Sequence, residues 1–372
     1  MGLGPMLKAI SLFSGIGGLD EGLHRAGFAP AFCSEIDPHA FESLQNWCWQ
    51  KKLSPQLGKD IRDFRPEQLI KQLELVPGEL DLLSGGPPCQ SFSLIGSRNS
   101  INDERGILLF KMIDYASVFL PKAVLIEQVK GLLSAKGPDG KSGSVMSSLI
   151  GALTELGYTV KHRVLRAADY GAPQLRDRVI IVALKGAKEF DFPQPSHSDL
   201  ANKDIKQPSL FDQKKPYITV HDAIADLPSP PRKGDRSPDI PSHLDVTPRR
   251  DRERINGVPE GECLARQFHL PKDQRMRLDP EKDTTKFRRM AWGKPALTLR
   301  GGEAFYHPSE NRYLTPREYM RLHGFSDTHL LFGPIRARSG SVRDLDQHRL
   351  VANAVPPPLA HAVGSQIRRC IA

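Results

Sequence analysis

The first half of the chain alternates short apolar runs with stretches of helical spacing, and this alternation restricts the fold more than any other feature. Strands that alternate with helices form a mostly parallel sheet covered by helices on both faces. The expected strands are 7–13, 29–35, 80–84, 123–127 and 179–184, and the expected helices are 18–26 and 146–156. The sequence therefore predicts an α/β fold.

Three reactive side chains stand at or just past the ends of expected strands. Glu35 closes the second strand, Cys89 follows the third, and Glu127 closes the fourth. In parallel sheets of this kind, ligands bind beyond the carboxyl ends of the strands. We therefore expect these three residues to converge on one edge of the sheet.

A glycine-rich segment, Phe13-Ser14-Gly15-Ile16-Gly17-Gly18, separates the first strand from the first helix. Glycines here let the backbone turn sharply and approach a ligand. Glu35 follows 17 residues later, where a carboxylate can accept both ribose hydroxyls of an adenosine cofactor. The spacing G-x-G-G favours an adenosyl cofactor without a pyrophosphate over a nicotinamide dinucleotide. Asp60 and Ile61 would suit the adenine amino group and its apolar face, unless Asp60 is an ordinary loop residue.

Cys89 lies in a rigid loop, Gly85-Gly86-Pro87-Pro88-Cys89-Gln90, where no core pattern surrounds it. A buried structural cysteine is the usual alternative, and it suits Cys33 or Cys370 better. A free thiol is only a few per cent ionised at pH 7, so a nucleophilic Cys89 needs activation or a substrate that drives attack. Glu127 near that thiol could bond to a ring nitrogen of the substrate; if Glu127 stood alone, a surface glutamate at a strand end would be the better interpretation.

At this point the motifs resemble the DNA cytosine-5 methyltransferases of bacterial restriction–modification systems, almost from end to end. The resemblance implies a Rossmann-like S-adenosylmethionine-dependent methyltransferase domain. It implies these cofactor-binding residues: Phe13, Gly15, Gly17, Gly18, Glu35, Ile36, Asp60, Ile61, Pro88, Leu108, Asn353 and Val355. It implies these catalytic residues: Cys89, Glu127, Arg176 and Arg178. No metal is implied.

The resemblance also implies a mechanism. The Cys89 thiolate would add to carbon 6 of a cytosine flipped out of double-stranded DNA, while Glu127 bonds to ring nitrogen 3. Arg178 would hold the carbonyl oxygen of the base and Arg176 the DNA backbone. Carbon 5 would then take the methyl group of S-adenosylmethionine.

The second half of the chain is richer in proline and charge. Residues 232–300 hold 17 Lys and Arg against 11 Asp and Glu, which suits contact with a polyanion. We expect a catalytic and cofactor-binding domain at 1–186, a smaller irregular target-recognition domain at 187–335, and a C-terminal segment at 336–372 that returns to the first domain. The DNA recognition sequence cannot be predicted from these residues.

Two motifs depart from the family pattern. Glu127-Gln128-Val129 stands where Glu-Asn-Val is typical, and Ala352-Asn353-Ala354-Val355 where Gly-Asn-Ser-Val is more usual. Gln carries the same amide as Asn on one extra methylene, so its hydrogen bonds are displaced. Because misplacement by about 1 Å can cost on the order of 100-fold in rate, the catalytic rate of a chain with Gln128 cannot be predicted from the family pattern. A catalytically decayed DNA-binding relative therefore remains an alternative, and so does a tRNA cytosine-5 methyltransferase, because a tRNA-modifying branch of the family shares this catalytic core.

Composition suggests a cytoplasmic protein. The formal net charge is +9, and no apolar run reaches the roughly 20 residues that span a bilayer. The N-terminus lacks the layout of a signal peptide. Five cysteines without a CxxC pair indicate a reducing compartment and no zinc site. We expect a monomer; whether a cognate restriction endonuclease exists cannot be inferred from this chain.

Overall fold

The computed structural model divides into two compact units. The first comprises residues 1–166, 177–194 and 355–372, and the second residues 167–176 and 195–354. The predicted domain limits differ, since 167–176 belong to the second unit and the chain returns to the first at Val355. The structure describes residues 5–88, 106–137, 139–186, 189–199, 214–265, 269–275, 279, 281, 287–336 and 345–371.

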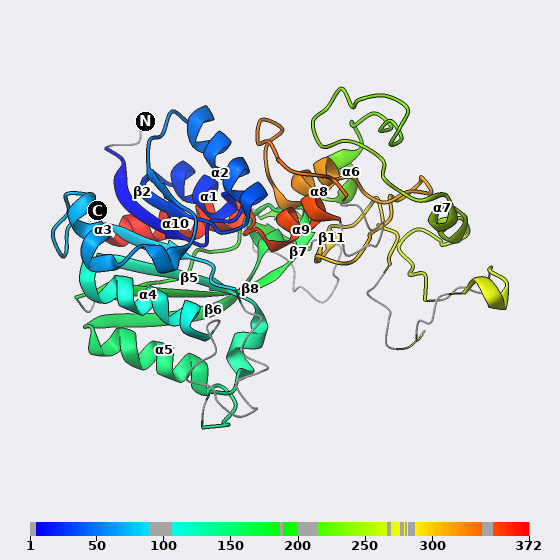
Figure 1. Cartoon of the computed structure of the whole chain (residues 1–372). Coiled ribbons are helices and arrows are strands. Elements are labelled where there is room, and N and C mark those ends of the chain that lie inside the picture. The colour runs from blue at the N-terminus through cyan, green and yellow to red at the C-terminus, as the bar shows by residue number, and fades with distance from the viewer. Residues whose placement is uncertain are drawn as a thin grey trace. The chain divides into compact units, whose positions relative to one another are not determined.

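A seven-stranded sheet forms the centre of the first unit, in the order β3-β2-β1-β4-β5-β8-β6 (Figure 1). The first five strands in this order pair in parallel, whereas β8 runs antiparallel to both β5 and β6. The strands have these bounds: β1 Leu7–Leu12, β2 Phe28–Ser34, β3 Gln56–Gly58, β4 Leu82–Gly85, β5 Ala123–Gln128, β6 Tyr158–Arg166 and β8 Asp177–Lys185.

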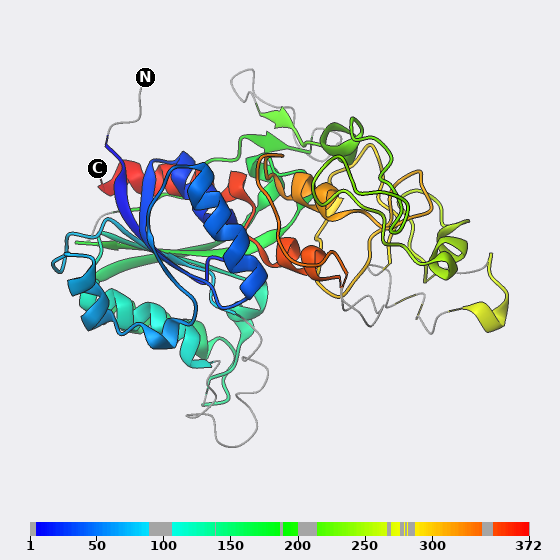
Figure 2. The same ribbon diagram turned by 45° about the horizontal axis from the view of Figure 1, so that its top comes forward.

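Helices cover both faces of this sheet (Figure 2). One face carries α1 Gly18–Arg25, α2 Pro38–Gln50 and α10 Pro357–Ile371. The other carries α3 Pro66–Gln72, α4 Gly106–Phe119 and α5 Ser144–Glu155. The predicted α/β class is confirmed, with one reversed strand. No helix in the described part of the chain is long and apolar enough to cross a membrane.

Two strands of this sheet were not predicted, the three-residue β3 and the longer β6. β6 lies at the edge of the sheet and carries consecutive polar residues, Lys161, His162 and Arg163, that are exposed or partly exposed. A strand with one free edge and solvated side chains lacks the apolar run of a buried strand. Its sequence therefore gave no strand signal.

Helix α10 packs directly on α1, although the two are far apart in the sequence. The contact is close because Gly22 has no side chain: a Cβ there would lie 2.4 Å from the Cβ of Ala360 and 2.5 Å from the carbonyl oxygen of Pro357. Gly364 of α10 likewise faces Leu23. Arg368 donates to the carbonyl oxygen of Ala26 at 3.2 Å, so the end of α1 is tied to α10.

The second unit has little regular structure. Its helices are α6 Val220–Ile224, α7 Arg249–Ile255, α8 Pro316–His323 and α9 Asp346–Asn353. Two-residue strands form the pairs β7 Gln174–Leu175 with β11 Ala296–Leu297, and β9 His197–Ser198 with β10 Lys215–Pro216. It is nevertheless packed, with a cluster of buried apolar residues that includes Ile255, Leu264 and Tyr306.

In the second unit, buried arginines donate hydrogen bonds to loop carbonyl oxygens that have no partner strand. The guanidinium of Arg289, 5% exposed, donates to the carbonyl oxygens of Ile255, His307 and Glu310 at 2.9–3.1 Å. Arg317 donates in the same way to Pro241 and to His329. Because an unpaired buried carbonyl costs free energy, these arginines make an irregular chain path stable.

The contact between α1 and α10 yields a prediction about stability. Gly22→Ala should lower the free energy of unfolding by about 1–3 kcal/mol, because the new methyl group overlaps backbone atoms of α10. Gly151→Ala, in the interior of α5, is the matched control: nothing lies within 4 Å of its Cβ position. That variant should gain up to about 1 kcal/mol from helix propensity. Urea unfolding followed by circular dichroism measures both, and equal effects would contradict the packing argument.

Candidate active site

The glycine-rich loop begins where β1 ends and leads into α1. Phe13, Gly15 and Gly17 all have positive φ, at 59°, 57° and 84°. A Cβ on Gly15 would meet nothing within 4 Å, so that glycine borders open space. Ser14 ties the loop to β1, because its hydroxyl donates to the hydroxyl of Ser11 at 3.0 Å. Three residues of this loop therefore adopt the left-handed backbone conformation, and the loop borders open space at Gly15.

Glu35 is bound to this loop. Its Oε2 accepts from the backbone N–H of Gly15 at 2.7 Å, and its Oε1 accepts from that of Asp37 at 2.8 Å. Burial raises the pKa of the Glu35 carboxyl, and the backbone donors only partly offset this. The next residue, Ile36, is 63% exposed. An exposed apolar side chain beside a partly buried carboxylate suits a ligand with both polar and apolar parts.

The other predicted cofactor residues of the first unit follow β3 and β4 or belong to α4. Asp60 follows β3 and caps a short 3₁₀ turn that begins at Ile61, which is buried. The Asp60 carboxylate is paired with Arg62 at 2.7 Å, which lowers its pKa. Pro88 is exposed after β4, and Leu108 of α4 packs partly buried against the core.

Glu127 and Arg178 form an ion pair at the end of the sheet. Arg178 Nε lies 2.7 Å from Glu127 Oε1, and each side chain is 11% exposed. Strand register places Glu127 opposite Ile180 and Gln128 opposite Val179, so Arg178 follows directly. Nη1 of Arg178 donates to the carbonyl oxygen of Asp177 at 2.8 Å. The carboxylate and guanidinium predicted to act together are therefore brought together.

The loop that leads to Cys89 is held against the same strand. Gly86 leaves so little room that a Cβ there would lie 3.3 Å from Glu127 Oε2. The side-chain amide of Gln128, 2% exposed, donates to the carbonyl oxygen of Pro87. Gln128 Oε1 is buried without a hydrogen-bond partner among the described residues. Cys89 itself lies outside the described residues.

Arg176 is placed differently from the prediction. It belongs to the second unit and is 2% exposed. Its guanidinium donates to the carbonyl oxygens of Leu299 at 3.1 Å and Ala352 at 2.6 Å. A contact with a DNA phosphate requires an outward guanidinium, so we revise that role. Asn353 is exposed at the end of α9, and Val355 is buried at the start of the return to the first unit.

Sequence reasoning missed Asp20, which lies behind the glycine-rich loop. Asp20 is 4% exposed in α1, and its Oδ1 lies 3.8 Å from Cys33 Sγ. Burial raises its pKa from the usual 3.8 to about 6, against opposing hydrogen bonds from Ser11, Cys33 and Ser14. A charged residue on the inward face of an amphipathic helix is the signal that could have revealed it.

Comparison with known proteins decides the family. The sequence model of the C-5 cytosine-specific DNA methylase family matches residues 7–369. The chain belongs to this family. It is a DNA (cytosine-5-)-methyltransferase that uses S-adenosylmethionine, which confirms the predicted enzyme class and cofactor. The type II methyltransferase M.AquIA from Picosynechococcus is 39% identical over 59% of this chain and 89% of its own length. The type II methyltransferase M.Eco47II from Escherichia coli is 31% identical over 96% of this chain and 78% of its own.

Solved structures agree on the fold. A protein described as a prophage-encoded DNA modification methyltransferase from E. coli superposes with a TM-score of 0.67, at 22% identity and over 98% of this chain and 99% of that one. The methyltransferase EhMeth of Entamoeba histolytica gives a TM-score of 0.62 at 15% identity and covers 98% of both chains.

The contact of Gln128 with Pro87 predicts an effect on rate. Gln128→Leu keeps the volume but leaves the Pro87 carbonyl without its donor, so the loop that carries Cys89 should lose its position. We expect kcat to fall by about 10- to 100-fold with the Kd for S-adenosylmethionine unchanged. Gln128→Asn, with the same amide on a shorter arm, should lose less. Steady-state kinetics and calorimetry measure the two quantities, and an unchanged kcat in the leucine variant would refute the anchoring role.

The buried Asp20 predicts a dependence of stability on pH. The unfolded state ionises near pH 3.8 and the folded state near pH 6, so the wild type loses stability as pH rises through this window. Asp20→Asn removes that loss, which amounts to roughly 3 kcal/mol for the full pKa difference. The stability of the variant relative to the wild type should therefore grow between pH 4 and pH 7 in urea titrations. Parallel pH profiles would show that the Asp20 pKa is not raised.

Proposed function

We propose that this enzyme methylates carbon 5 of a cytosine flipped out of double-stranded DNA, within one short sequence, as part of a type II restriction–modification system. The contact that carries the proposal is the Glu127–Arg178 ion pair beside Gly86. This ion pair lies next to the loop that leads to Cys89, the proposed nucleophile. The names of the relatives, which are type II methyltransferases, support the restriction–modification setting.

Glu127 and Arg178 are proposed to hold the pyrimidine ring. The carboxylic acid form of Glu127 donates to ring nitrogen 3, where negative charge develops during attack. Arg178 has one terminal nitrogen with no hydrogen-bond partner among the described residues, and this group would donate to the carbonyl oxygen at carbon 2. Preorganised donors of this kind, in a site that excludes water, stabilise charge more than donors in bulk water do.

Cys89 is proposed as the nucleophile. Its thiolate forms a bond to carbon 6, and the electron pair of the 5,6 double bond makes carbon 5 nucleophilic. After carbon 5 has been methylated, a base takes the proton from carbon 5. The electrons of that C–H bond restore the double bond, and the thiolate leaves carbon 6. Cys89 is thus regenerated, and the cytosine gains one methyl group in place of one hydrogen.

The residues of the glycine-rich loop suit S-adenosylmethionine, which supplies an electrophilic methyl group when bound. The open space beside Gly15 accepts a ligand close to the backbone. Glu35 would accept from the ribose hydroxyls, and exposed Ile36 would contact the adenine ring. Asp60 would accept from the adenine amino group, for which it must turn from Arg62. Phe13, Gly17, Gly18, Ile61, Pro88 and Leu108 complete the proposed pocket.

Arg176 is proposed as a positioning residue. Its bonds to the carbonyl oxygens of Ala352 and Ala354, at 2.6 and 3.3 Å, hold the backbone on both sides of Asn353. Asn353 and Val355 are expected to complete the cofactor site. The other terminal nitrogen donates to the carbonyl oxygen of Leu299 at 3.1 Å, and a lysine at 176 would lack the planar fork that holds both sides at once.

The long, basic second unit favours DNA over tRNA as the substrate, and we assign target recognition to it. The four described cysteines outside the catalytic loop are all free thiols, which fits a reducing cytoplasm. We expect the enzyme to act as a monomer.

Expression in a host that lacks cytosine methylation tests the proposal. Bisulfite sequencing should show protected cytosines in one short sequence motif, and the Cys89→Ser variant, expressed to the same level, should protect none. Purified enzyme should transfer labelled methyl groups to duplex DNA and not to tRNA. A fully converted genome from soluble enzyme that binds the cofactor would contradict the proposal, and transfer to tRNA alone would establish the RNA alternative.

A further inference from the structure

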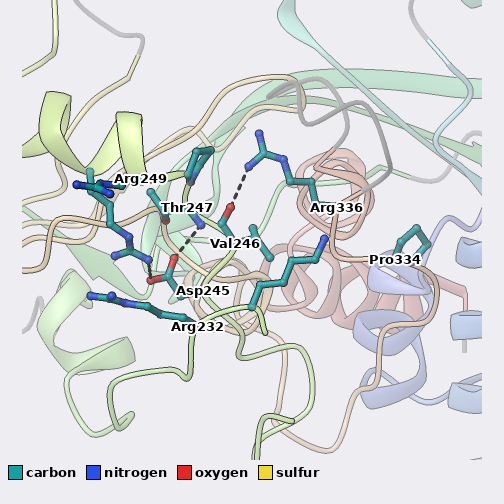
Figure 3. A pocket seen from close by; sticks show the side chains of 10 residues that line it. Arg232, Asp245, Val246, Thr247, Arg249, Pro334 and Arg336 are labelled. Carbon is teal, nitrogen blue, oxygen red and sulfur yellow. Dashed lines mark hydrogen bonds and ion pairs between the residues drawn. The ribbon is translucent and has the colours of Figure 1, made fainter. Parts of the chain in front are cut away.

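A basic pocket lies within the second unit, apart from any residue assigned above. It has a volume of about 920 Å³. Its walls come from three segments: residues 232–233, the stretch 245–252 that includes the start of α7, and residues 334–336 (Figure 3). The segments are joined, because the N–H of Lys233 donates to the carbonyl oxygen of Asp245 and Arg336 donates to that of Val246, both at 2.9 Å.

The pocket has a large surplus of positive charge. Five cations line it against one carboxylate: Arg232, Lys233, Arg249, Arg252 and Arg336 against Asp245. Asp245 already has two partners: it forms an ion pair with the guanidinium of Arg252 and accepts a hydrogen bond from the N–H of Thr247 at 2.9 Å.

Three of the other cations, Arg232, Lys233 and Arg249, have exposed side chains. The side chains of Arg232 and Lys233 are exposed and have no partner among the described residues. The Arg249 side chain is 94% exposed and lies 3.6 Å from that of Glu253, which is 65% exposed, so solvent screens this ion pair. A cluster of like charges is unfavourable by itself, so an anionic ligand would stabilise it.

We infer that this pocket binds the sugar–phosphate backbone of the DNA substrate and anchors the second unit to the duplex. The inference rests on the proposed function, which makes double-stranded DNA the substrate. Arg232, Lys233 and Arg249 donate to phosphate oxygens. Val246, Pro248 and Pro334 supply an apolar wall, which suits the deoxyribose between two phosphates and gives a bare inorganic ion no additional contact.

The chemistry of the pocket indicates an anchor rather than a reader of bases. Base edges are distinguished by paired donors and acceptors, whereas this pocket offers three exposed cations and no free carboxylate or amide. Contacts to phosphate fix the position of a protein on DNA without reading its sequence. Binding should therefore weaken equally on every duplex when these cations are removed.

The test is the salt dependence of DNA binding by the full chain. Arg232→Ala/Lys233→Ala should lower the slope of log K against log salt by about 1–2, and should weaken binding about tenfold near 0.1 M salt. The loss should be the same on duplexes with and without the target sequence. Arg249→Ala should show half the effect or less. All three side chains are exposed, so the variants should fold as the wild type does.

A matched control removes the same charges elsewhere. Arg65→Ala/Lys71→Ala deletes one exposed arginine and one exposed lysine at α3, in the first unit, and should leave the slope unchanged. An unchanged slope in the pocket variant, a loss confined to the target sequence, or a slope reduced equally by the control would each overturn the inference. So would a mononucleotide that binds through Arg232 and Lys233 while duplex binding is unaffected by their loss. If the wild type bound duplex DNA through this pocket but transferred no methyl group, only the proposed function would fail.

Discussion

The reversal of β8 is the constraint on which the proposed active site depends. In a parallel sheet every strand ends at the carboxyl edge, so each can contribute only the residues that follow it. A strand that runs the other way begins at that edge. Its first residues, Asp177 and Arg178, therefore meet the last residues of β5, Glu127 and Gln128. Antiparallel pairing thus joins an acid and a cation that lie 51 positions apart, and each is held by a ladder rather than by a flexible loop.

Buried backbone N–H and carbonyl groups find their hydrogen-bond partners differently in the two units. The first pairs its N–H and carbonyl groups in a sheet, so its functional residues stand at strand ends with few degrees of freedom. The second has short helices and two-residue strands, and it satisfies carbonyl oxygens with the guanidinium groups of Arg176, Arg289 and Arg317. These fixed interior contacts leave the outer loops free to differ in sequence. The base recognition proposed for this unit could therefore change while its interior stays the same.

Much of the first unit was predictable because its signals are local. Apolar runs gave the central strands, and Glu35, Glu127 and the glycine-rich loop were expected at the edge where the structure places them. β6 was missed because an edge strand has solvated side chains. The inward turn of Arg176 could not be predicted, since its partners Leu299 and Ala352 lie more than 120 residues away. The basic pocket escaped prediction for the same reason: three distant segments form it.

The packing of α10 on α1 has a consequence for how the protein is made. Ala26 and Arg368 are separated by 342 positions, so the ribosome completes the entire second unit before α10 can cover the face of α1. During that time Gly22 and Leu23 present an uncovered apolar surface. Contacts between such distant segments form slowly, and exposed apolar surface favours aggregation. Nascent chains should therefore depend on chaperones, and translation arrested before α10 should yield protein that cannot complete its first unit.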